Sequence, residues 1–408
     1  MAHPDAPHPL RAAAPSRVRS KGERPRGGPP QLAGNPAPRP PRLPLRHRLP
    51  LLPRHEAITT DTIFTILSTT KAITGTAALP GANGAVVMTE VEAKLPDRTE
   101  RYALPLAGVE EKGDIGPLAA QLALSRLRQG RRVGYLTDAF ADDRTPEAVM
   151  SALREGLTLP TDDGELRFIA GPDLASIQLP SPMVIRRLSA EQSNSSMILG
   201  DAVVLKIIRK ISPGIHPEAE MTRYLTAAGY ANAAPLLGEV VRVAADGTPH
   251  TLMLAQGFIR NQGDAWGWTQ DWLHRTIDEL ALTDGSAEAE EPFAGYTSFA
   301  AAIGRRLGEL HAALSRPTDD PAFSPETASE ADRGGWAAGA MAQLDPALDI
   351  LRRGAKDLSE ADKAVAERLL ARADALRAAV SRLAQSAAGA LKTRVHGDFH
   401  LGQVLVVQ

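Results

Sequence analysis

The stretch LKTRVHGDFHLGQVLVV, at residues 391–407, decides how the fold of the whole chain is interpreted. Apolar residues on both sides of its polar centre predict two short strands joined by a loop. Asp398 lies in this loop, where flanking strands can hold a carboxylate rigidly while it still faces a cleft. His400 follows two residues later and Gln403 follows five residues later.

The spacing of these side chains suits phosphoryl transfer. That reaction needs a carboxylate that accepts the hydroxyl proton, oxygen ligands for Mg²⁺ and a cation on the phosphates. In a kinase catalytic loop the base and the metal-binding amide are five residues apart, as Asp398 and Gln403 are. An amide oxygen is a hard ligand that suits Mg²⁺, and His400 lies where a donor could reach the transferred phosphate. The alternative interpretation is an ordinary turn in which Asp398 makes an Asx-type hydrogen bond.

A lysine in an apolar strand, Lys206 in VVLKII, is the candidate for the cation. A lone lysine of this kind often only extends its stem along apolar surface. Here a helix is predicted to begin at Pro217, and its Glu220 could form an ion pair that aims the ammonium group at the α- and β-phosphates of ATP. Glu218, on the same turn, is the rival for this pairing.

The polar turn at 191–196 lies between two predicted strands, where kinases place a loop that covers the phosphates. It contains no glycine, so backbone N–H groups and the hydroxyls of Ser193, Ser195 and Ser196 would have to bind the phosphates. The sequence contains no GxxxxGK[ST] motif, which argues against a Walker-type nucleotide site.

The predicted elements form a sheet-rich part followed by a helical part. Residues 183–260 predict an antiparallel sheet that carries one helix, with a tight hairpin turn at Gly200-Asp201. Upstream, a small α/β module is predicted, with a hairpin at 84–107 and a helix at 116–128. Apolar spacing then predicts helices at about 264–282, 296–315, 334–354 and 359–388.

Six stretches occur in a characteristic order along residues 185–408. They are EQSNSS at 191–196, VLKIIRKISPG at 204–214, HPEAEMTRYL at 216–225, APLLG at 234–238, NQGDAW at 261–266 and VHGDFHLGQVL at 395–405. By these stretches, which together are far more specific than any one of them, residues 185–408 resemble the maltokinases, relatives of the aminoglycoside phosphotransferases within the protein-kinase-like superfamily.

The resemblance implies an α+β, protein-kinase-like bilobal fold, with an antiparallel sheet in the N-lobe and a mainly helical C-lobe. Together with the composition of the N-terminal residues, it leads us to expect five segments along the chain. These are a disordered basic Pro/Arg-rich arm (1–55), a foreign-looking segment (56–82), a small α/β cap domain (83–182), the kinase N-lobe (183–260) and an incomplete kinase C-lobe (261–408).

The resemblance also implies an activity. Maltokinases use ATP and Mg²⁺ to convert maltose to maltose 1-phosphate, which feeds glycogen and trehalose metabolism, and some are fused to trehalose synthase. On this basis Asp398 and His400 are the expected catalytic residues and Gln403 the expected Mg²⁺ ligand. Lys206, Glu220 and the three serines are expected to bind ATP. In this superfamily a second metal-binding Asp follows the catalytic loop by about one strand, so a chain that stops at residue 408 is expected to transfer phosphate slowly or not at all.

Three alternatives remain open. The chain could phosphorylate a different small-molecule hydroxyl, or be a non-catalytic kinase-like module that binds a partner such as trehalose synthase. More remotely, residues 58–79 resemble the start of the serine β-lactamases and penicillin-binding proteins, with Ser68 and Lys71 one helical turn apart. The sequence lacks the Lys-Thr-Gly strand motif of that group, so a composite reading frame is the preferred interpretation of residues 1–80.

Composition argues against several other classes of protein. The 408 residues are 43% hydrophobic and 23% charged and include no cysteine, which excludes disulfides and thiolate metal sites. No apolar run approaches the roughly 20 residues that a membrane helix needs. Residues 1–55 are basic, but they are dense in proline and poor in aromatic residues that could stack on bases. We therefore expect a cytoplasmic protein that binds neither nucleic acid nor membranes.

Overall fold

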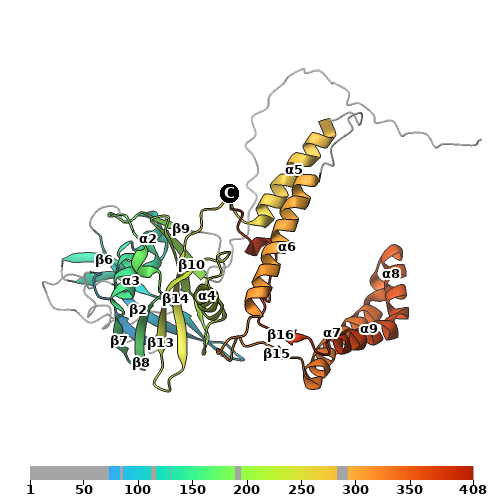
Figure 1. Ribbon diagram of the computed structural model, residues 1–408. Coiled ribbons are helices and arrows are strands. Elements are labelled where there is room, and N and C mark those ends of the chain that lie inside the picture. Colours follow the sequence, from blue (N-terminus) through green and yellow to red (C-terminus); the bar gives the residue numbers. More distant parts are fainter. Residues whose placement is uncertain are drawn as a thin grey trace, which may run out of the picture. The chain divides into compact units, whose positions relative to one another are not determined.

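The computed structural model describes residues 73–82, 86–111, 116–129, 131–188, 194–282 and 293–407. The predicted arm (1–55), Ser68, Lys71 and Ser193 lie outside these residues. Within them, no helix combines the length and the apolar character needed to cross a membrane. The described chain is α+β, as predicted, with two antiparallel sheets followed by a series of helices (Figure 1).

The first sheet has seven described strands in the order β12-β3-β2-β4-β6-β5, with β1 also paired to β2. The predicted hairpin is present, because β2 and β3 pair in antiparallel register around a turn at 95–98. The strands are β1 (Ile73–Ala78), β2 (Val86–Lys94), β3 (Thr99–Ala103), β4 (Leu106–Glu110), β5 (Ala123–Gln129), β6 (Arg132–Asp138) and β12 (Lys210–Ile211).

The second sheet also has seven described strands, in the order β7-β8-β13-β14-β11-β10-β9. The turn between β10 and β11 lies at Gly200-Asp201, and both residues have positive φ (56° and 51°), which suits a tight hairpin turn. The strands are β7 (Thr158–Thr161), β8 (Gly164–Ala170), β9 (Ile185–Arg187), β10 (Asn194–Leu199), β11 (Val203–Ile208), β13 (Leu236–Val243) and β14 (Pro249–Gly257).

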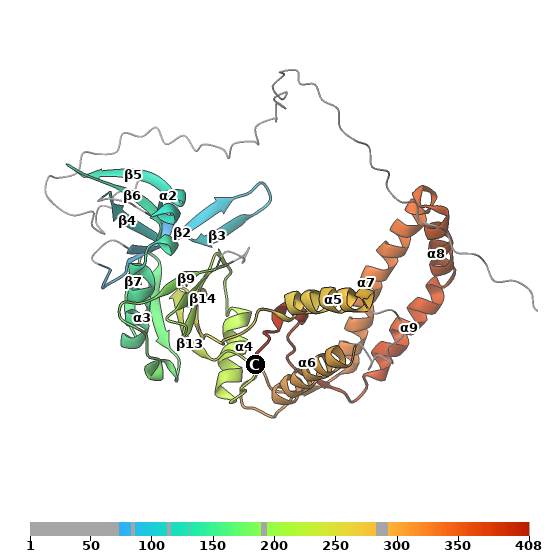
Figure 2. The same ribbon diagram turned by 90° about the horizontal axis from the view of Figure 1, so that it is seen from above.

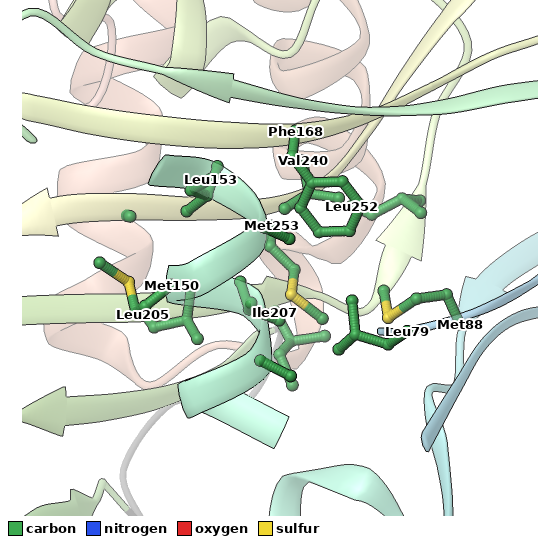
Figure 3. Packing of buried hydrophobic residues seen from close by; sticks show 14 of the residues in the cluster. Leu79, Met88, Met150, Leu153, Phe168, Leu205, Ile207, Val240, Leu252 and Met253 are labelled. Carbon is green, nitrogen blue, oxygen red and sulfur yellow. The ribbon is translucent and has the colours of Figure 1, made fainter. Parts of the chain in front are cut away.

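One hydrophobic core joins the two sheets. It contains Leu79 and Met88 from the first sheet and its flanking loop, together with Ile207 and Met253 from the second (Figure 3). The helix α3 (Arg144–Glu155) packs on β8 and β13 and adds Met150 and Leu153 to the same core.

This core crosses the predicted boundary between a cap domain and an N-lobe at residues 182 and 183. Strands β7 and β8 come from the predicted cap, yet they extend the sheet of the predicted lobe. In return, β12 from the lobe pairs with β3 of the cap. The end of the segment predicted to be foreign is also included, since β1 pairs with β2 and Ala82 is fully buried.

The helix predicted at 116–128 is wrong over most of its length. A short helix, α2 (Pro117–Gln121), ends after five residues, and β5 continues the chain. Exposure alternates from Leu124 to Arg128, with Leu127 buried between the exposed Arg126 and Arg128, which is the period of a strand. Antiparallel pairing with β6 provides the backbone hydrogen bonds that a helix would otherwise have made.

The helical part follows the predicted order with shifted ends. One predicted helix, at 359–388, is two helices that break at Arg372, whose N–H bonds the carbonyl of Leu369. The helices are α4 (Pro217–Ala227), α5 (Ala265–Leu282), α6 (Ala294–Leu314), α7 (Glu330–Gly354), α8 (Glu360–Ala371) and α9 (Ala373–Ser386). The short strands β15 (Glu326–Thr327) and β16 (Leu391–Lys392) pair with each other.

Aromatic side chains hold α5 against α6. The ring centroids of Trp268 and Phe299 are 4.1 Å apart, and those of Trp272 and Tyr296 are 5.1 Å apart.

Figure 2 shows α7 and α9 as neighbouring antiparallel helices, in agreement with their contacts. The predicted helical lobe therefore consists of helix pairs that pack locally.

Candidate functional site

Lys206 lies on β11, an interior strand of the second sheet. Its neighbours in sequence, Leu205 and Ile207, are fully buried on the opposite face and belong to the shared core. Successive strand residues point to opposite faces, so Lys206 lies on the face that α4 covers. A second apolar cluster, which includes Ile208 of β11 and Ala219 of α4, packs on that face.

The ammonium group of Lys206 pairs with Glu218, and the predicted pairing with Glu220 is wrong. Lys206 Nζ lies 2.7 Å from Glu218 Oε1, and the two side chains are 22% and 30% exposed. Glu218 is the second residue of α4, and Glu220 is turned about 200° from it around the helix axis. The helix therefore presents Glu218, and not Glu220, to the strand.

Glu220 instead reaches the segment that leads into the HGD loop. It forms an ion pair with Arg394, whose guanidinium also lies 5.2 Å from the centre of the Phe323 ring. Phe323 stacks on Tyr224 of α4, with ring centroids 3.9 Å apart and ring planes within 2°. The helix α4 thus contacts the lysine strand through Glu218 and the HGD segment through Glu220.

The predicted phosphate-binding serines divide between the two faces of the second sheet. Ser196 is paired directly with Lys206 across β10 and β11, so both residues lie on the α4 face. Ser195 lies on the other face, where its hydroxyl accepts a hydrogen bond of 2.9 Å from Arg209 Nε. Arg209 is itself paired with Asp138 of the first sheet at 2.8 Å. The structure therefore brings only Ser196 of these two next to Lys206.

Asp398, His400 and Gln403 gather in one exposed loop. Asp398 Oδ2 lies 3.9 Å from His400 Nε2, and Gln403 Nε2 lies 3.5 Å from the same nitrogen. His400 Nδ1 accepts a hydrogen bond of 3.1 Å from the N–H of Gly402. In a neutral ring, an Nδ1 that accepts leaves the proton on Nε2, whose 3.9 Å separation from Asp398 Oδ2 is beyond hydrogen-bond distance.

The two strands predicted around this loop are much reduced. The first is the two-residue β16, and the second is a single bridge between Leu405 and Asp264. Instead, a short 3₁₀ helix, η4 (Leu401–Gln403), follows His400. Backbone hydrogen bonds of 2.8 Å from Ala265 N to Val404 O and of 2.9 Å from Gln262 N to Val406 O then attach the chain to the start of α5.

His216, beside Lys206 and Glu218, is a candidate functional residue that the sequence analysis did not identify. It is the N-cap residue of α4, and its Nδ1 is buried with no hydrogen-bond partner among the described residues. Burial lowers the pKa of its imidazole; Glu218 nearby raises this pKa, and Lys206 lowers it further. The signal in the sequence was its place immediately before Pro217 and Glu218, at the start of the helix whose Glu218 pairs with Lys206.

The residues present fit a magnesium ion only in part. The exposed loop offers the Asp398 carboxylate and the Gln403 amide, both of which carry the oxygen ligands that Mg²⁺ prefers. Within the described ranges, no cluster of three or more His, Cys, Asp or Glu side chains is arranged to hold a metal. A metal at this loop would therefore take its remaining ligands from phosphates and water.

Comparison with known proteins gives relatives for much of the chain. A glucosamine kinase of Mycolicibacterium smegmatis is 26% identical over 220 residues, which are 54% of this chain and 48% of that protein. A glucosamine kinase of Streptacidiphilus jiangxiensis is 26% identical over 329 residues, which are 74% of this chain and 67% of that protein. The chain thus spans about half the length of the first relative.

Solved structures share the fold. A glucosamine kinase in complex with glucosamine, ADP and inorganic phosphate superposes with a TM-score of 0.50 and 22% sequence identity. The match covers 80% of this chain and 63% of that one. Residues 184–407 match the family described as APH, Phosphotransferase enzyme family, and these residues include Lys206, α4 and the Asp398 loop. The chain therefore belongs to the phosphotransferase enzyme family and has its kinase-like α+β fold.

Proposed function

We propose that this chain transfers the γ-phosphoryl group of ATP to a hydroxyl group of a sugar. The observation that carries the proposal is the ion pair between Lys206 and Glu218, at 2.7 Å, on the face of a buried sheet. An acid on the adjacent helix that holds a strand lysine is the arrangement by which kinases aim an ammonium group at the nucleotide phosphates. Membership of the phosphotransferase family supports the same assignment.

Asp398 would act as the base. Its carboxylate accepts the proton of the sugar hydroxyl while the hydroxyl oxygen attacks the γ-phosphorus, and the bond from that phosphorus to the ADP oxygen breaks. His400 Nε2 lies 3.9 Å from this carboxylate, so the ring would have to move closer before a hydrogen bond could orient the base. When bound, Mg²⁺ would neutralise charge on the phosphates, and Gln403 is the amide that would hold it.

Lys206 would hold the α- and β-phosphates, with Ser196 beside it on the same face. Glu218 replaces Glu220 as the acid that orients the lysine. Glu220 and Ser195 are then left with structural contacts, to Arg394 and to Arg209 respectively.

Glucosamine is the first candidate for the acceptor, because the relatives of known structure and the two curated relatives above are glucosamine kinases. Maltose, phosphorylated to maltose 1-phosphate, is the second candidate. It is favoured by the six ordered sequence matches to the maltokinases. With maltose as the acceptor, the chain would act in glycogen and trehalose metabolism, and trehalose synthase would be a candidate partner.

The test measures sugar-dependent release of ADP by the 408-residue chain, with ATP and Mg²⁺ and with glucosamine, maltose or no sugar. ADP affinity, measured by calorimetry, is a second readout that does not require turnover. Lys206→Ala should weaken ADP binding, whereas the control Asp374→Asn, on a fully exposed side chain of α9, should leave it unchanged. Unchanged ADP affinity in Lys206→Ala, with no sugar-dependent turnover in the unaltered chain, would contradict the proposal.

A further inference from the structure

We infer that Arg394 is a positioning residue, which fixes the Asp398 loop to helix α4 through its ion pair with Glu220. This inference rests on the proposed function, since it concerns how the proposed base is held relative to the proposed phosphate-binding lysine. Arg394 precedes Asp398 by four residues, and its role concerns the loop and not the reacting atoms.

The contacts of Arg394 come from two directions. Its guanidinium pairs with Glu220, whose side chain is 17% exposed, and lies over the ring of Phe323 at 5.2 Å. Phe323 is almost fully buried and stacks on Tyr224, which lies one turn after Glu220 on α4. Both contacts of Arg394 therefore depend on α4. The helix supplies the Glu220 carboxylate directly, and its Tyr224 supports the Phe323 ring.

The rest of the loop has few such contacts. His396, Asp398, Phe399 and His400 make their polar and ring contacts within residues 396–403. The hydrogen bonds, ion pairs and ring contacts of the described residues 393–400 are mostly local. Among these residues, Arg394 is the one that makes such contacts with a distant part of the chain, through Glu220 and Phe323. Because the Asp398 side chain is 86% exposed, its position depends on the chain that precedes it and on η4.

Helix α4 is well suited to act as the reference for this loop. It packs on the second sheet through Ala219, in the cluster with Ile208, and Glu218 fixes Lys206. Its other side packs through Leu225 on Leu314 at the end of α6 and on Phe323. An error in the distance between base and phosphates affects the rate more than nucleotide binding, because it changes the geometry of attack. The ion pair of Glu220 and Arg394 thus relates the two halves of the proposed site.

The test uses two readouts on the complete 408-residue chain. The first is hydrogen exchange of the backbone amides of residues 396–403, which does not depend on catalysis. The second is kcat and KM for ATP in sugar-dependent ADP release. The variants are Arg394→Gln, Arg394→Lys and the reversed pair Glu220→Arg with Arg394→Glu. The matched control is Arg377→Gln, which removes an arginine of α9 that pairs with Asp345 of α7 and with Asp374 of α9.

Arg394→Gln should speed exchange at 396–403 and lower kcat by about 10-fold to 100-fold, with KM for ATP changed by less than about twofold. Arg394→Lys, which keeps the charge, should retain part of the protection, and the reversed pair should restore most of it. Arg377→Gln should change neither readout.

Two results would overturn the inference: exchange at 396–403 that is the same in Arg394→Gln as in Arg377→Gln, or a reversed pair that is no better protected than Arg394→Gln. Unchanged ADP affinity in Lys206→Ala, together with no sugar-dependent ADP release by the unaltered chain, would count against the proposed function. The exchange measurements decide the role of Arg394 separately, because they do not depend on turnover.

Discussion

Glu90 and Arg242 form a buried ion pair that joins the two sheets, and its removal should be among the most destabilising single changes in the protein. Glu90 lies on β2 of the first sheet and Arg242 on β13 of the second, and each side chain is 1% exposed. Arg242 Nη1 also approaches Asp163 Oδ2 at 4.0 Å. Glu90 Oε2 and Arg242 Nη2 are buried without a hydrogen-bond partner among the described residues.

The magnitude follows from this burial. Glu90→Gln keeps the size of the side chain but leaves the buried guanidinium with only the half-exposed Asp163 carboxylate, 4.0 Å away, as a counter-charge. Loss of one partner of a buried pair typically lowers the free energy of unfolding by about 3–5 kcal/mol. Replacing both residues, as Glu90→Leu with Arg242→Met, removes both desolvation costs. Such replacements are often neutral or stabilising by about 1–4 kcal/mol, so the double variant should be more stable than either single variant.

Urea unfolding followed by circular dichroism measures these differences. The control is Asp201→Asn, in the pair of Arg186 and Asp201, whose side chains are 57% and 51% exposed. An exposed pair contributes about 0–1 kcal/mol, so this variant should unfold almost as the unaltered chain does. The reasoning is refuted if Glu90→Gln is no less stable than Asp201→Asn, or if the double variant is the least stable of all.

Four further outcomes are expected. Lys206→Ala should raise the dissociation constant for ADP, measured by calorimetry, because an ammonium group that can reach the phosphates is lost. Asp398→Asn should lower kcat by about 10²–10⁴-fold with a nearly unchanged KM for ATP in the ADP-release assay. Burial holds the pKa of His250 below its usual 6.5, so the unfolded chain binds this proton more readily. Stability from His250 is therefore present above about pH 6.5 and lost as the pH falls through the lower folded pKa; His250→Gln should flatten that part of a urea-midpoint series run from about pH 8 to about pH 5. Ser329→Ala removes the capping box of α7 and should reduce the stability of that helix by about 1 kcal/mol in the same unfolding assay, whereas Ser329→Asp should not.

Local signals in the sequence predicted many of the elements. The Gly200-Asp201 turn required positive φ at both positions, and the structure has it. Pro217 was predicted to open a helix, and α4 begins there. These features depend on a few neighbouring residues, so a short stretch of sequence is enough to specify them.

Long-range pairing could not be read in the same way. The two-residue strand β12 joins β3, more than 100 positions earlier in the chain, and no periodicity in Lys210–Ile211 indicates that partner. The segment after Gln121 has apolar residues that suit a short helix as well as a strand, and the pairing of β5 with β6 decides between them.

The sequence predicted which residues belong to the candidate site better than it predicted which of them contact each other. The candidate catalytic loop was chosen from the spacing of Asp398 and Gln403, and in the structure both side chains lie near His400. The choice between Glu218 and Glu220 depended on which side of α4 faces β11, and the role of Glu220 depended on Arg394, some 170 residues further along the chain. Neither fact is expressed in the neighbouring sequence.

The exchange of strands between the two sheets also constrains how the protein can be synthesised. The first sheet lacks an edge strand until residues 210–211 have been made, and the second lacks an interior strand until β14 ends at Gly257. At about 5–20 residues per second, the interval from Val86 to Gly257 takes roughly 10 to 30 seconds on the ribosome. Throughout this time Val86, Met88 and Leu106, which are buried in the finished protein, have no complete surface to pack against. A nascent chain of this protein should therefore be a good client for ribosome-associated chaperones until the last strand of the second sheet emerges.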